Sequence, residues 1–580
     1  MPQTHRRSAS TASPARAVVA VLAATSLTLS ACSTLPQNSS PKVLHSFEPA
    51  ATPEPSMGPR AGEEPDLLLR DFYAASALPA GDYSAARSFM TEEAAGDWDP
   101  DQQVLIVDSL DIITNAEADS TEGGRSFNVR GSVIGTLSEG GSYTSENGDF
   151  EAQIHMTQVD GEWRISDLPE VVVIERTELR NRYQPHSLFF YEHTGQALES
   201  DRRWLSTGQE SLDTELITLL LQGPAEELAP ATMSVVPREA NFGGIEDGVY
   251  HFTGMSDMSQ EDRTRFAAEL VWTLSTAGIP GPYRVVADDA PLVEGLDELT
   301  TDDFADYNPK ANTDAATSLY AVTNGNVVRL SGNETQPLNN PAANAGNVES
   351  AEISAEETFA AVRKKGADKT QLVLGTLNGD VAESLEGESI TRPTFGITGR
   401  GAWVAVDGKK IYRVVRSTTG EVSEQQINAD ALDGIDGEIS VMRLSSTGAR
   451  VAFIIGGAVY SGVVAQETDG DYRIVNVREL ASELGRNALS LDWQPDGSLV
   501  VGTSSTETPV WRIEQDGSSL TTLPSGNITA PVVSVAASPT TVYLTDANAL
   551  LRLPSGESDS VFWREVPGLQ GVRAAPIVGN

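Results

Sequence analysis

The chain has 580 residues, with 40 Lys and Arg against 82 Asp and Glu and a net charge of −42 at pH 7. So acidic a surface repels nucleic-acid phosphates and anionic lipid headgroups, which argues against a nucleic-acid partner and a basic membrane-binding patch. Cys32 is the only cysteine, so no internal disulfide can form. At roughly 150 residues per domain, the length predicts about three or four domains.

Residues 1–31 are predicted to be a signal peptide. Three arginines precede an uncharged apolar run over residues 17–29, and this run is shorter than the roughly 20 residues of a membrane-crossing helix. The run leads into the letters LSAC at 29–32, which resemble the bacterial lipobox. The resemblance implies cleavage between Ala31 and Cys32, S-diacylglycerol on the Cys32 sulfur and an acyl chain, such as palmitate, on its amino group. An ordinary signal peptide and an uncleaved membrane anchor are the alternatives.

Residues 32–65 are predicted to be the lipidated cysteine followed by a tether. Seven prolines fall in this segment and no apolar periodicity accompanies them. Proline-rich linkers extend by about 3.1 Å per residue, so some thirty residues reach roughly 90 Å from the lipid. Cleavage would also remove three arginines and take the net charge from −42 to −45.

Residues 66–180 are predicted to form a small α+β domain. Apolar spacing indicates helices near 67–73 and 85–90, and strands follow at 104–107, 127–137 and 150–159. A hairpin turn is expected at Asp160-Gly161. Helices that lead into a curved antiparallel sheet resemble the NTF2-like fold, a scaffold with many uses that says little about chemistry.

Residues 186–310 are predicted to form a second α+β domain. We expect a strand at 187–191, helices at 212–221 and from Ser259 onward, and a hairpin at Asp247-Gly248. The letters LLLQGP at 219–224, DGVY at 247–250 and WTL at 272–274 resemble the GerMN domain of bacterial envelope and sporulation proteins.

Residues 315–580 are predicted to form a β-propeller of about six blades. Similar strings of three short strands recur at 390–414, 439–464, 488–513 and 532–553. The turn glycines Gly399, Gly448 and Gly497 are 49 residues apart, and a period of about 40–50 residues is typical of propeller blades. A β-sandwich with irregular spacing is the alternative.

No strong catalytic signature is present. The sequence lacks HExxH, GxSxG and Walker motifs, so we predict no enzyme activity and no cofactor. His186 and His193 are the only histidines close enough to suggest a metal pair, and we interpret both as surface residues. The residues expected on the inner propeller strands are apolar, which disfavours a catalytic centre there; these are Phe395, Val441, Leu491 and Val535.

The order of these modules resembles the actinobacterial LpqB lipoprotein family along essentially the whole chain. The resemblance implies a lipoprotein anchored to the cell membrane on its extracytoplasmic face. It implies a non-enzymatic accessory that binds the extracytoplasmic part of the sensor kinase MtrB and modulates the MtrAB two-component system, which bears on cell-wall homeostasis and division. One alternative is a cell-wall glycan-binding lipoprotein that uses exposed Trp403, Trp511 and Trp563. Another is a propeller-based envelope hydrolase.

Overall fold

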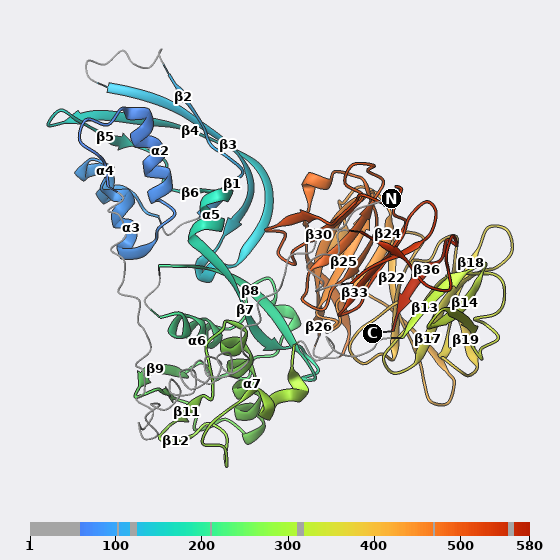
Figure 1. Ribbon diagram of the computed structural model, residues 1–580. Helices are drawn as coiled ribbons and strands as arrows, with labels where there is room; N and C mark the ends of the chain where they lie inside the picture. The colour runs from blue at the N-terminus through green and yellow to red at the C-terminus, as the bar shows by residue number, and fades with distance from the viewer. Residues whose placement is uncertain are drawn as a thin grey trace, which may run out of the picture. The chain divides into compact units, whose positions relative to one another are not determined.

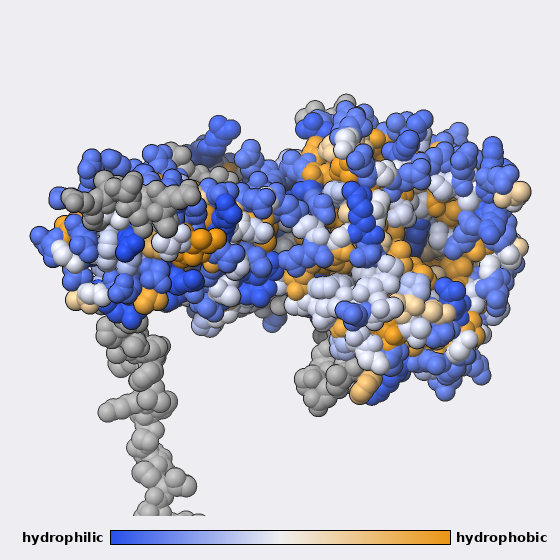
Figure 2. Space-filling view, turned by 90° about the horizontal axis from the view of Figure 1, so that it is seen from above, coloured by the Kyte–Doolittle hydropathy of each residue, from blue (hydrophilic) through white to orange (hydrophobic). Residues whose placement is uncertain are grey.

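The computed structural model describes residues 58–100, 104–115, 124–208, 211–309, 318–467, 470–554 and 562–579. Ala31 and Cys32 lie outside the described residues. Residues 57–580 form one compact unit. In the described part of the chain, no helix is both long and apolar enough to cross a membrane. The face shown in Figure 2 is mostly hydrophilic, with smaller apolar patches between the charged side chains.

The N-terminal domain places helices on one face of a curved sheet (Figure 1). The sheet has the order β5-β4-β3-β1-β6, with β2 paired to β3, and only β1 and β6 run parallel. Leu68 and Phe72 of the first helix pack in one core with Phe127 and Ile154 of the sheet. The elements are α2 Pro65–Ala75, α3 Ala80–Arg87, α4 Glu92–Asp97, β1 Val104–Val107, β2 Asp111–Thr114, β3 Gly124–Leu137, β4 Tyr143–Val159, β5 Glu162–Asp167 and β6 Val172–Glu175.

Two predicted boundaries in this domain differ from the structure. The second helix ends at Arg87, whereas the sequence suggested residues 85–90. Strand β4 begins at Tyr143 rather than at 150. No sequence pattern indicated this first part of the strand, because residues 144–149 are polar and largely exposed and show no apolar alternation. The hairpin at Asp160-Gly161 is present, and both residues have positive φ (54° and 85°), as a tight two-residue turn requires.

The second domain is built around a buried helix, α7. Phe266, Leu270, Val271 and Leu274 of this helix have no solvent exposure, and the Oγ of Ser259 accepts a hydrogen bond from the Asp262 amide at its N-terminus. The domain has a sheet of order β12-β11-β10-β9 and a separate hairpin, β7-β8. Helix α5 Arg176–Arg182 leads from the first domain into the second, and its Leu179 packs in the core of the first. The elements of the second domain are β7 Tyr183–Tyr191, β8 Leu198–Ser206, α6 Leu212–Gln222, β9 Asn241–Glu246, β10 Val249–Thr253, α7 Gln260–Thr276, β11 Arg284–Ala287 and β12 Ala290–Pro291.

The described residues from 318 onward form six four-stranded sheets, which agrees with the predicted number of blades. Blade one contains β13 Leu319–Thr323, β14 Asn326–Ser331, β15 Glu334–Pro337 and β36 Ala575–Val578; blade two contains β16 Val348–Ile353, β17 Thr358–Lys364, β18 Thr370–Thr376 and β19 Val381–Gly387; blade three contains β20 Thr394–Phe395, β21 Gly401–Val406, β22 Lys410–Arg416 and β23 Val422–Gln426.

The other three blades follow the same order along the chain. Blade four contains β24 Ile439–Leu444, β25 Arg450–Ile455, β26 Ala458–Gln466 and β27 Tyr472–Glu479; blade five contains β28 Ala488–Trp493, β29 Leu499–Thr503, β30 Val510–Ile513 and β31 Leu520–Thr522; blade six contains β32 Ser534–Ala537, β33 Thr541–Thr545, β34 Leu550–Pro554 and β35 Arg564–Glu565.

The last strand completes the first blade. Strand β36 pairs antiparallel with β13, so the C-terminal end of the domain joins its N-terminal end. The first strands of neighbouring blades contact one another from β20 through β24, β28 and β32 to β36, and β36 contacts β16. These innermost strands therefore surround the propeller axis. Short 3-10 helices complete the described chain at Glu139–Gly141, Ala229–Ala231, Thr301–Tyr307, Asp430–Leu432 and Ser482–Leu484.

Candidate functional site

Three charged residues stand at equivalent positions on innermost strands. Arg443 of β24 and Asp492 of β28 are 49 residues apart, the same spacing as the turn glycines Gly448 and Gly497. Glu352 of β16 precedes the corresponding turn of blade two. The propeller repeat therefore brings all three side chains to the axis.

These residues form one buried ion-pair cluster. The Nη1 of Arg443 donates to Glu352 Oε2 at 2.6 Å, and its Nε donates to Asp492 Oδ1 at 2.9 Å. Each of the three side chains is only 4% exposed. Arg443 also donates to the carbonyl of Pro393, while Asp492 accepts from the Ala537 amide. The cluster thus connects blades two to six.

Attraction between opposite charges stabilises the cluster in spite of its burial. Burial by itself would lower the pKa of Arg443, but the charges of Asp492 and Glu352 outweigh it and raise that pKa. Burial lowers the pKa of the neighbouring Arg392, whose Nη2 lies 3.0 Å from Glu352. A buried charge without its partner is costly, so each member holds the others in place. We interpret the cluster as a framework element.

A cavity of about 360 Å³ lies on the axis beside this cluster. It is bordered by the first residues of the innermost strands, so it opens at the ends where these strands begin. Arg392 and Arg443 border it from the side of the cluster. The remaining wall is mixed apolar and polar and includes Glu349, Ser440, Val441, Leu489, Ser490, Leu491, Val533, Ser534, Val535 and Arg573. Its size falls within the usual range for small-molecule sites.

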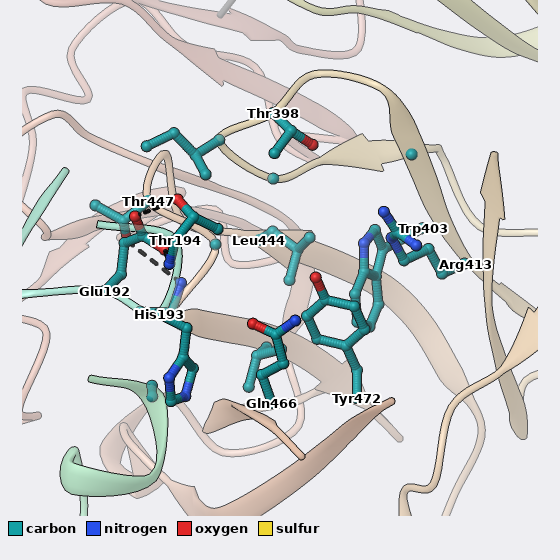
Figure 3. Close-up of a pocket in the computed structure, with 17 residues that line it drawn as sticks. Glu192, His193, Thr194, Thr398, Trp403, Arg413, Leu444, Thr447, Gln466 and Tyr472 are labelled. Atoms are coloured by element: carbon teal, nitrogen blue, oxygen red, sulfur yellow. Dashed lines mark hydrogen bonds between the residues drawn. The ribbon is translucent and has the colours of Figure 1, made fainter. Parts of the chain in front are cut away.

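A second, smaller cavity lies where the β7-β8 turn meets blades three and four (Figure 3). The carboxylate of Glu192 accepts hydrogen bonds from the amide and hydroxyl of Thr194, both at 2.6 Å. Across the cavity, the rings of Trp403 and Tyr472 meet edge to face with their centroids 5.4 Å apart. The guanidinium carbon of Arg413 lies 5.2 Å from the centroid of the tyrosine ring. At about 60 Å³ the space is too small for a ligand of more than a few atoms.

Ion pairs hold the β7-β8 hairpin to the propeller. The Nε of Arg450 donates to Glu199 Oε1 at 2.8 Å, and both side chains are largely buried. Arg202 pairs with Glu514 at 3.0 Å and with Asp516 at 3.2 Å. These contacts define the junction, by which we mean the contact between the hairpin and blades four and five.

The two histidines singled out in the sequence do not form a metal site; His193 borders the smaller cavity of Figure 3. The Nε2 of His193 lies 2.6 Å from the carbonyl of Pro230, while His186 is part of strand β7. Among the described residues, no group of three or more His, Cys, Asp or Glu side chains is arranged to hold a metal ion.

The prediction of an apolar propeller interior was confirmed only in part. The inner strands were expected to be apolar; Val441, Leu491 and Val535 do line the cavity, but Glu352, Arg443 and Asp492 stand beside them. Asp492 lies 49 residues after Arg443, so the repeat predicts that the two side chains occupy equivalent positions in neighbouring blades.

The tryptophans proposed for glycan binding do not form an exposed surface. Trp403 and Trp563 are 4% and 2% exposed, because both side chains belong to hydrophobic cores of the propeller. Trp511 is half-buried and donates from Nε1 to the Thr508 carbonyl.

Comparison with known proteins decides the family. The family model for the LpqB N-terminal domain matches residues 58–180, a sporulation and spore germination domain matches 187–293, and the LpqB β-propeller domain matches 325–579. The lipoprotein LpqB of Corynebacterium diphtheriae is 39% identical over 563 residues, which cover 95% of this chain and 96% of that protein. The chain belongs to the LpqB lipoprotein family.

Other LpqB proteins are similar over the same extent. LpqB of Rhodococcus jostii is 35% identical and covers 96% of this chain and 97% of its own length. Among solved structures, a periplasmic gluconolactonase from Pseudomonas aeruginosa covers 45% of this chain and 99% of its own, with 13% identity and a TM-score of 0.29. That likeness carries no argument about activity. The LpqB relatives are named as lipoproteins and not as enzymes, and the name implies a lipid anchor at a membrane.

Proposed function

We propose that this protein is an extracytoplasmic lipoprotein that modulates an MtrB-like sensor kinase without catalysing a reaction itself. In this proposal residues 1–31 are removed, Cys32 carries the diacylglycerol and acyl chains, and residues 32–65 tether the folded part to the membrane. The domains at 66–180, 186–310 and 315–580 supply the binding surfaces.

The observation that carries the proposal is membership of the LpqB lipoprotein family over 95% of the chain. A lipid anchor confines a protein to the membrane plane and raises its effective concentration near any membrane receptor. Two or more acyl chains give stable attachment, whereas one chain gives marginal attachment. An accessory that acts on a membrane kinase gains from such confinement.

The buried charges support a binding role over a catalytic one. Arg443, Glu352 and Asp492 pair with one another, and Arg450 pairs with Glu199. Charged side chains that pair with one another in this way stabilise the domains and their junction. A stiff body with exposed loops is suited to contact another protein.

The kinase as partner rests on the family resemblance, and copurification tests it. A tagged full-length protein, expressed in a strain that lacks the untagged copy, is crosslinked in intact cells and purified from solubilised membranes. We expect an MtrB-like kinase to be enriched over the Cys32→Ala variant, which lacks the proposed lipid attachment. Equal recovery of the kinase with both forms, or no kinase with either, would count against the proposal.

Peptidoglycan binding serves as the second arm of this test. Purified residues 57–580 are incubated with wall fragments and sedimented. We expect no enrichment in the pellet, since Trp403 and Trp563 are buried. Sedimentation with the wall, together with loss of the kinase contact, would favour the glycan-binding alternative.

A further inference from the structure

The rim of the axial cavity is shaped by a repeated backbone irregularity. The pairing of innermost strands with their neighbours skips one residue in blades two, four and five, at Glu349, Ser440 and Leu489. Such β-bulges re-aim side chains and are common next to binding and active sites. All three skipped residues line the cavity.

The cavity faces away from the junction. Strand β24 runs from Ser440 at the cavity to Leu444, and Thr447 of the following turn donates a hydrogen bond to Glu199 of the hairpin. The cavity and the junction therefore lie at opposite ends of the innermost strands. Binding at the cavity does not require the hairpin to move.

One part of the cavity wall is apolar and open. Leu489 and Val533 are each 39% exposed, and they are among the few large hydrophobic side chains that the described residues leave exposed. Val441 and Val535 extend this wall deeper toward the axis. Exposed apolar side chains that gather in a concave site favour an apolar ligand body.

Another part of the wall is cationic. Arg573 is exposed at the rim, and no carboxylate of the described chain pairs with it. Arg392 shares Glu352 with Arg443, while its own Nε has no hydrogen-bond acceptor within the part of the structure described. An incompletely paired guanidinium gains from an anionic oxygen. The carboxylate that lines the cavity, Glu349, lies 3.5 Å from Lys364.

We propose that the axial cavity binds a small organic anion with an apolar body. Its acidic group would lie at Arg573 and Arg392, and its apolar part would lie along Leu489 and Val533. The ligand class follows from this pairing of cations with open apolar side chains in one concavity. The proposal is independent of the kinase and of the lipid anchor.

Three probes separate the two parts of the proposed ligand. Octanoate carries both the anion and the apolar chain, acetate carries the anion alone, and octanol carries the chain alone. Isothermal titration calorimetry uses residues 57–580, the compact unit of the chain. We expect octanoate to bind about tenfold or more tightly than either of the other probes, since a charge-assisted hydrogen bond and apolar burial each contribute on that scale.

Matched substitutions assign the binding to the cavity. Arg573→Glu should weaken octanoate binding about tenfold, whereas Arg564→Glu, at an exposed position of β35, should leave it unchanged. Leu489→Glu should abolish binding, whereas Ile245→Glu should not, although Ile245 is also 39% exposed. Thermal melts of all four variants confirm that each protein is folded.

The source of the anion is tested with vesicles. We expect residues 57–580 not to float with phosphatidylglycerol vesicles, because a free small anion is the proposed ligand. Flotation that Arg573→Glu removes would assign the site to membrane lipid and overturn the proposal. Absence of octanoate binding, equal binding of octanol, or equal effects of Arg573→Glu and Arg564→Glu would also overturn it.

Discussion

Arg443 is the residue that joins the two carboxylates of the charged cluster at the propeller axis. Its guanidinium contacts the carboxylates of Glu352 and Asp492 and the Pro393 carbonyl. We expect Arg443→Met to destabilise the propeller by about 3–5 kcal/mol, since it leaves two buried carboxylates without their partner. Calorimetric unfolding of residues 57–580 measures the loss.

A partly exposed arginine provides the control for that measurement. Arg512 pairs with Asp496 at 2.6 Å, but both side chains are partly exposed to solvent. Arg512→Met should therefore cost no more than about 1 kcal/mol. An Arg443→Met protein as stable as the Arg512→Met protein would contradict the framework role of the cluster.

The buried carboxyl of Glu269 should make the stability of the fold decrease as the pH rises. Burial on helix α7 raises the pKa of this carboxyl to about 8, against an ordinary value of 4.5, although a hydrogen bond from the Tyr191 amide opposes the shift. Between pH 4.5 and about 8, the Glu269 carboxyl is therefore protonated in the folded state and ionised in the unfolded chain. The stability that this proton contributes is complete below pH 4.5 and is lost as the pH rises toward 8.

Glu269→Gln isolates this effect. The variant should match the wild-type stability near pH 4.5 and exceed it by about 2–4 kcal/mol at pH 8.5, because the amide has no proton to lose. Melting temperatures across this pH range provide the measurement. Glu261→Gln, at an exposed position on the same helix, should show no such divergence. A constant difference between Glu269→Gln and the wild type at all pH values would refute the prediction.

The junction connects the second domain to the propeller through buried ion pairs. A double-mutant cycle of Glu199→Gln and Arg450→Gln should give a coupling free energy of about 1–3 kcal/mol, since this pair is largely buried. The exposed pair Arg130 and Glu151 provides the comparison, with an expected coupling below about 1 kcal/mol. Equal coupling in both cycles, measured by urea unfolding, would mean that the junction pair is effectively solvated.

Sequence patterns predicted the inner part of each blade better than its outer part. Three strands per repeat were expected, and the structure has four. The missed outermost strands β23 and β31 are mostly polar and partly exposed, so they show neither alternation nor an apolar run. Inner and central strands such as β21 and β25 are buried throughout and stand out as apolar segments.

The axial charges could be predicted only in part. Arg443 and Asp492 follow from the 49-residue period once the blades are aligned. Glu352 does not, because blade two lies outside the four strings in which the repeat was recognised. The junction pairs join residues about 250 to 310 positions apart, and no local pattern indicates such contacts.

At the scale of the whole molecule, the proposed function depends on the lipid anchor. We expect Cys32→Ser to abolish lipid addition and the cleavage that depends on it, because the sulfur is the proposed attachment point. Mass spectrometry of the N-terminal peptide checks the wild type, and globomycin should cause its precursor to accumulate. Normal processing and stable membrane association of Cys32→Ser would show that Cys32 is not the anchor.

The central claim is that this membrane-anchored lipoprotein modulates a sensor kinase. Its most direct test compares the transcripts of the kinase's target genes in a deletion strain carrying the wild-type gene, the Cys32→Ala variant or an empty vector. The account predicts that deletion alters these transcripts, that the wild type restores them, and that the Cys32→Ala variant restores them poorly because it loses membrane confinement. Unchanged transcripts in the deletion strain, or full restoration by the Cys32→Ala variant, would contradict it.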